Sequence, residues 1–180
     1  MKRERTNKNL ERYIYIAILC AHGVIIGLIE RSIPSPFVFA PGAKIGLPNS
    51  ITLLSLFTLN FRDSLALVLI RLVLTTLIGG TVSTFMYAFS GAMLSFFSMY
   101  LIKKLHPKYI SFIGISAVGG IMHNVGQLVT ASLIAQSFSV MLYLPVLAVM
   151  GILAGIAVGI VVNYLLKHVK ALGLITTKLY

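Results

Sequence analysis

Long apolar runs, separated by short polar breaks, restrict this sequence to very few architectures. Six runs can be drawn, at residues 13–30, 45–60, 64–80, 82–102, 109–133 and 142–166. Each is near the ~20 residues with which an α-helix crosses about 30 Å of hydrocarbon, although the second and third are short. No alternating apolar–polar period is present, and a helix satisfies its own backbone hydrogen bonds in lipid. The sequence therefore predicts an all-α integral membrane protein with six transmembrane helices.

The composition agrees with this class and gives no sign of a second domain. Of the 180 residues, 58% are hydrophobic and 11% are charged, and the mean hydropathy is +0.95. A soluble domain of this length could not bury so much apolar surface. We expect a cytoplasmic basic segment at 1–12, one membrane domain at 13–170 and a cytoplasmic tail at 171–180.

The basic residues predict the orientation of the helices. If the N-terminus is cytoplasmic, 12 of the 15 Lys and Arg residues lie inside and only Arg31 and Lys44 lie outside, with Arg71 in the membrane. Cytoplasmic loops of membrane proteins carry such an excess. We therefore expect both termini in the cytoplasm of a multi-pass protein of the bacterial cytoplasmic membrane. The net charge of +11 then reflects topology and does not indicate nucleic-acid binding.

Polar side chains within the apolar runs are the candidates for function, because they are costly in a bilayer. Arg71 lies near the middle of the third run, and three roles are open to it: pairing with Glu30, binding main-chain carbonyls, or binding an anionic ligand. In the fifth run, His123, Asn124 and Gln127 are spaced to lie on one side of a helix. They either form hydrogen bonds between helices or line a ligand cavity.

The segment PGAKIGLPNS at 41–50 interrupts two apolar runs with prolines, glycines and a lysine. Irregular backbone is tolerated at a membrane protein's core only where protein or a cavity shields it from lipid. We expect it to belong to a folded cap over an outer ligand pocket, with a non-functional turn as the alternative. Lys44 and Asn49 would contribute polar groups to this pocket, and Phe37 and Phe39 would cover it.

Small residues at intervals of four predict close helix packing. Gly151, Gly155 and Gly159 form a groove on the sixth run, and Ala17 and Ala21 form a smooth patch on the first. We expect the glycines to pack within the fold and the alanines to dock a partner membrane protein.

The sequence does not predict an enzyme, a cofactor or a metal site. It contains no phosphate-binding P-loop motif and no metalloprotease motif, and it has one cysteine, Cys20. Its four acidic residues include a single aspartate, Asp63, which leaves almost no ligands for Mg²⁺-diphosphate chemistry.

Three separated motifs resemble the Gx transporter family, also named heptaprenyl diphosphate synthase component I. They are PGAKIGLPN, LIRLVLTTLIGGTVST and GGIMHNVGQL, and the resemblance covers about residues 10–170. The family is similar to the S-components of energy-coupling factor (ECF) transporters. That similarity implies six helices, an outer ligand pocket and a small-residue patch on the first helix, matched in kind by Ala17 and Ala21, which docks a coupling subunit.

The resemblance implies a substrate-binding subunit for uptake of a small molecule, energised by a transmembrane coupling subunit and ATPases. On this prediction the ligand-binding residues are Lys44, Asn49, Arg71, His123, Asn124, Gln127, Phe37 and Phe39. Two alternatives stay open. The first is a non-transporting subunit of a flavin- or quinone-linked electron-transfer system, with an extracytoplasmic NusG-II-domain protein as partner. The second is an accessory protein of polyprenyl diphosphate synthesis.

Overall fold

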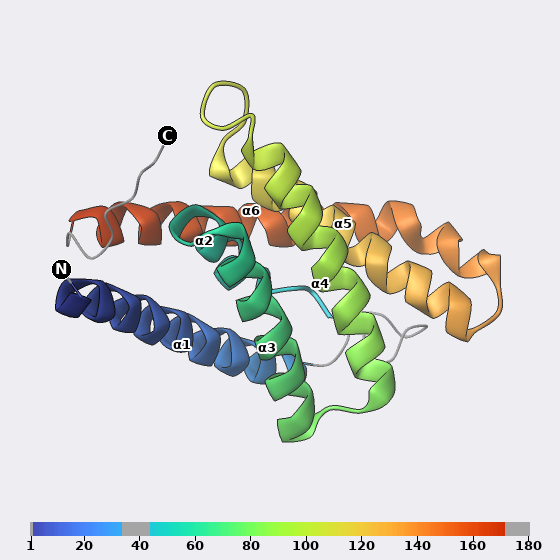
Figure 1. Cartoon of the computed structure of the whole chain (residues 1–180). Helices are drawn as coiled ribbons and strands as arrows, with labels where there is room; N and C mark the ends of the chain where they lie inside the picture. The colour runs from blue at the N-terminus through green and yellow to red at the C-terminus, as the bar shows by residue number, and fades with distance from the viewer. Residues whose placement is uncertain (1, 34–43, 172–180) are drawn as a thin grey trace.

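The computed structural model describes residues 2–33 and 44–171, and within them it contains helices and no strand. The element order is α1 (Lys2–Ser32), α2 (Asn49–Thr58), α3 (Phe61–Gly79), α4 (Val82–Lys103), α5 (Phe112–Ile134), the 3₁₀ helix η1 (Phe138–Tyr143) and α6 (Leu144–Ala171). The all-α prediction is confirmed for these residues. Figure 1 shows the N-terminal end of α1 and the C-terminal end of α6 on the same side of the molecule.

Four of these helices are long and apolar enough to cross a membrane, which identifies a membrane protein. The candidate spans are Asn9–Ser32, Val82–Lys103, Phe112–Ile134 and Phe138–His168. The count of six is not confirmed. Helix α3 has 19 residues but contains Arg62, Asp63 and Arg71, whereas α2 has 10 residues and is about 15 Å long, half a span.

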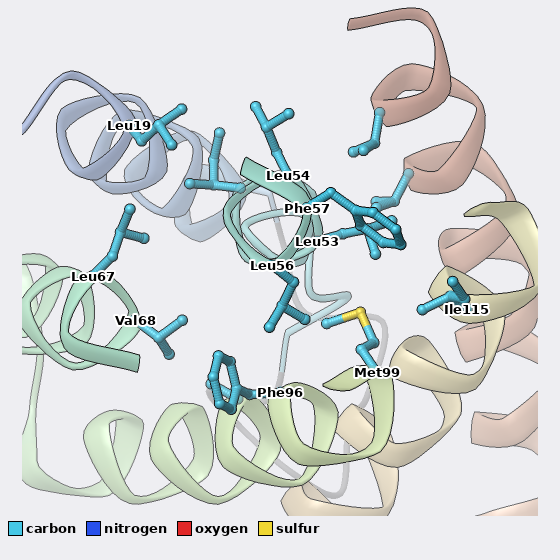
Figure 2. Packing of buried hydrophobic residues seen from close by; sticks show 14 of the residues in the cluster. Leu19, Leu53, Leu54, Leu56, Phe57, Leu67, Val68, Phe96, Met99 and Ile115 are labelled. Carbon is cyan, nitrogen blue, oxygen red and sulfur yellow. The ribbon is translucent and has the colours of Figure 1, made fainter. Parts of the chain in front are cut away.

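Helix α2 forms the centre of the core instead of facing lipid. Pro48 precedes its first residue, and Leu59, in extended conformation, follows its last. Figure 2 shows Leu53, Leu54, Leu56 and Phe57 of α2 surrounded by side chains from four other helices, Leu19, Leu67, Val68, Phe96, Met99 and Ile115. A helix enclosed on all sides must be apolar around its whole circumference, which explains why its sequence resembles a membrane span.

Polar contacts fix the C-terminal end of α2. The Lys103 ammonium donates a hydrogen bond to the Leu56 carbonyl and lies 4.9 Å from the centroid of the Phe57 ring. Ser64 donates to the Ser55 carbonyl at 2.9 Å. The last carbonyls of a helix have no partner within the helix; Lys103 supplies one for Leu56, whereas the Ser55 carbonyl also accepts from the Leu59 N–H at 2.8 Å.

Helices α5 and α6 form a close antiparallel pair (Figure 1). A Cβ atom added to Gly155 would lie 2.5 Å from Ala117 Cα, and one added to Gly159 would lie 2.6 Å from Ile113 Cα. Gly151 faces Gly120 in the same way. The predicted groove is therefore confirmed, and the neighbour that fills it is α5.

Candidate functional site

A polar pocket lies between α1, α3, α4, α5 and the segment 44–48 that leads into α2. The cavity itself has a volume of about 40 Å³, and the unfilled space that includes its open mouth is about 530 Å³. Its charged and amide groups come from well-separated parts of the chain: Glu30, Arg31, Lys44, Asn49, Arg71 and His123. Its walls also include Leu72, Ala88 and Ala92, with three threonines, Thr75, Thr76 and Thr84.

Arg71 is the most deeply buried cation of this pocket. It is 5% exposed, and its Nε atom has no hydrogen-bond partner among the described residues. Glu30 and Arg71 interact electrostatically, but no ion pair joins them. For its Nε atom, the described residues therefore supply neither a carboxylate nor a main-chain acceptor, the first two of the three roles expected from the sequence.

His123 is the second buried polar group without a hydrogen bond. It is 6% exposed, and neither ring nitrogen has a partner of hydrogen-bond geometry among the described residues, although the Gly91 backbone lies near the ring. Native proteins bond nearly all buried polar atoms, so an orphaned imidazole beside an orphaned guanidinium is a reason to expect a ligand.

Glycines make the room for these two side chains. A Cβ atom on Gly23 of α1 would lie 2.5 Å from Arg71 Cδ, and one on Gly91 of α4 would lie 2.9 Å from the His123 ring. Gly46 has a φ of +95°, a conformation that L side chains rarely adopt, and its missing Cβ would lie 3.0 Å from both His123 Cδ2 and Asn49 Nδ2.

Two side chains hold the segment 44–48 against the pocket. The Gln127 amide accepts from the Lys44 backbone N–H at 2.6 Å and donates to the Lys44 carbonyl at 2.8 Å. Glu30 Oε1 accepts from the N–H groups of Gly46 at 2.5 Å and Leu47 at 2.9 Å. These bonds replace the backbone partners that an irregular segment lacks.

The half-buried Lys44 side chain enters the pocket from this segment, outside the predicted spans. Burial lowers the pKa of Lys44 from its ordinary value, because desolvation disfavours the charged amine. Glu30 opposes this change, and Arg31 and Arg71 add to it.

The structure divides the predicted site residues into three groups. Lys44, Asn49, Arg71 and His123 meet in the one pocket. Asn124 and Gln127 are not part of its lining: Asn124 donates to the Leu147 carbonyl of α6 at 2.7 Å, and Gln127 binds the Lys44 backbone. Phe37 and Phe39 lie outside the described residues.

The sequence did not point to several groups that line the pocket, and it suggested a different partner for one of them, Glu30. Glu30 was considered only as a partner for Arg71, whereas its recorded bonds go to the segment 44–48. Thr75, Thr76 and Thr84 were not singled out, although hydroxyl groups close together in an apolar run are an available signal.

Ala17 and Ala21, the residues of the predicted docking patch, are exposed on α1, on a face that no described helix covers.

Fold and pocket together define a helical membrane protein with a polar site between its helices. Residues 19–165 match the family described as heptaprenyl diphosphate synthase component I, so the chain belongs to this family, as its motifs indicated. The comparisons with curated proteins and with solved structures found no match.

Proposed function

We propose that this chain is the substrate-binding subunit of an uptake system for a small anionic molecule. The observation that carries the proposal is Arg71, a buried cation that lines the pocket and forms no ion pair with a described residue. An uncompensated buried charge costs several kcal/mol, about what an anionic ligand could offset on binding. Lys44 adds a second positive charge, and His123 adds two ring nitrogens that have no partner of hydrogen-bond geometry among the described residues.

In this proposal the pocket opens outward and separate subunits supply the energy. By the positive-inside rule, the pocket would lie in the outer half of the membrane and both termini in the cytoplasm. The exposed Ala17 and Ala21 would dock a transmembrane coupling subunit, as in ECF S-components. In this proposal the chain binds the molecule and does not transform it.

Mass spectrometry of small molecules that co-purify with the protein tests the proposal. We expect a bound anion in the wild-type protein and its loss from the Arg71→Gln and His123→Ala variants. An Arg62→Gln variant is the matched control, because Arg62 is exposed and lies outside the pocket. A bound molecule retained equally by all four proteins would refute the site.

The family description supports a second candidate, an accessory role in polyprenyl diphosphate synthesis. A diphosphate is also an anion, so the same pocket would bind it. Titration with inorganic pyrophosphate and with simple carboxylates separates the two candidates. Preferential binding of pyrophosphate, together with lower polyprenyl diphosphate synthesis after deletion, would favour the accessory role. Co-purification of a coupling subunit and ATPases would favour uptake, whereas capture of an extracytoplasmic domain would favour an electron-transfer role.

A further inference from the structure

The pocket contains a carboxylate as well as cations, and the two kinds of charge are not joined. Glu30 is 4% exposed and Arg71 is 5% exposed, and both line the pocket, from α1 and α3 respectively. They interact electrostatically without an ion pair. Both side chains line one pocket without forming an ion pair, so a molecule bound in the pocket could contact both.

Glu30 keeps bonding capacity for such a molecule. Its bonds to the N–H groups of Gly46 and Leu47 both use Oε1, and Oε2 bonds no described residue. An ionised carboxylate has about four acceptor positions, so two bonds at one oxygen leave the other oxygen able to accept from a ligand.

The threonines of α3 extend the acceptor side of the pocket. Thr75 Oγ1 donates to the Arg71 carbonyl at 2.8 Å, and Thr76 Oγ1 donates to the Leu72 carbonyl at 2.8 Å. A hydroxyl group has one hydrogen, so each of these oxygens can only accept from a ligand. A simple anion has no hydrogen to donate to these acceptors, and the Glu30 carboxylate would repel it.

We infer that the ligand is bipolar: it carries an acidic group that binds Arg71 and Lys44 and a protonated amine that binds Glu30. Its chemical class is that of the amino acids and related zwitterions. This inference rests on the proposed function and adds the amine to the anion that the function requires. A cation without an acidic group is disfavoured by Arg71 and Lys44, and an anion without an amine is disfavoured by Glu30.

Thermal unfolding of the detergent-purified protein with matched probes tests the inference. The probes are the common amino acids, the corresponding carboxylic acids without the amine, and the corresponding amines without the carboxylate. We expect at least one amino acid to bind about tenfold or more tightly than both of its analogues, because a site built for a donor rejects a molecule that lacks it. Glu30→Gln should weaken the amino acid but not the carboxylic acid, and Arg71→Gln should weaken both.

The results that would overturn the inference differ from those that would overturn the proposed function. Equal binding of the amino acid and its carboxylic acid, or an amino-acid affinity unchanged by Glu30→Gln, would overturn the inference. If carboxylic acids nevertheless bind through Arg71, the proposed function survives that result. If no probe raises the unfolding midpoint in the wild-type protein, the bipolar ligand is refuted, and a co-purified anion lost from Arg71→Gln would still support the function.

Discussion

The α5–α6 pair and the pocket beside it both depend on glycine, but they use it for opposite purposes. In the pair, Gly151, Gly155 and Gly159 bring the backbone of α6 so close to the backbone of α5 that no Cβ atom would fit between them. Around the pocket, Gly23 and Gly91 face the side chains of Arg71 and His123 instead.

The comparison shows how one bundle can be rigid and still contain a polar site. Contact between helix backbones supplies the packing that lipid cannot drive hydrophobically. Glycines opposite polar side chains create volume in which a long charged group can be buried. Substitution of a glycine in the α5–α6 pair should therefore affect folding, whereas substitution around the pocket should mainly affect binding.

The largest expected effect is that of Gly155→Leu. The new side chain would start 2.5 Å from Ala117 Cα, and backbone cannot move aside as a flexible side chain does. We expect a loss of about 3 kcal/mol or more in unfolding free energy, or no folded protein at all. Size-exclusion chromatography and thermal unfolding measure this. Val161→Leu, on an exposed face of the same helix, is the control, and equal stability of the two variants would show that α5 and α6 are not in close contact.

The fold could be predicted from the sequence better than the site, for reasons visible in single residues. The run at 82–102 corresponds to α4 at Val82–Lys103, because an apolar run in lipid has few alternatives to a helix. The run at 45–60 was predicted as a span because burial by protein and burial by lipid select the same residues. In the structure it is a helix of 10 residues, enclosed by its neighbours.

The site shows what could not be predicted from the sequence. Periodicity placed Gln127 on the same side of α5 as His123, and it could not reveal that Gln127 binds the backbone of Lys44, 83 residues away. Any residue type presents the same backbone N–H and carbonyl, so a side chain that binds backbone has no recognisable partner in the sequence. Arg71 was found because a charge in an apolar run has few explanations.

Gln127→Leu should have the next largest effect, and it should be local. The variant removes both bonds to the Lys44 backbone and leaves an N–H and a carbonyl unsatisfied, at about 2–3 kcal/mol in total. We expect faster hydrogen exchange at residues 45–47, with exchange in the α5–α6 pair unchanged. Val129→Leu, at a partly exposed position on the same helix, is the control. Unaltered exchange at 45–47 would mean that Glu30 alone holds the segment.

Arg71→Met should stabilise the ligand-free protein while abolishing anion binding. Methionine fills much of the same volume without a charge to desolvate, and replacing buried charges by apolar groups is often favourable. We expect a gain of about 1–2 kcal/mol in unfolding free energy without ligand. Arg62→Met at the exposed start of α3 should change stability little. A large destabilisation by Arg71→Met would indicate that the guanidinium stabilises the fold, and the comparison between the two glycine-lined regions would then fail.

The smallest effect concerns pH and Lys44. Because burial lowers the pKa of Lys44, its positive charge is lost at a lower pH than that of an exposed lysine. Anion affinity should therefore fall a few-fold as pH rises from ~7 to ~10, since the amine is charged below its pKa and neutral above it. Isothermal titration with a simple carboxylate, which has no amine and stays ionised over this range, follows this change. Lys44→Arg keeps its charge throughout and should give a flat profile, so a wild-type profile as flat as that of the arginine variant would place the Lys44 amine away from the anion.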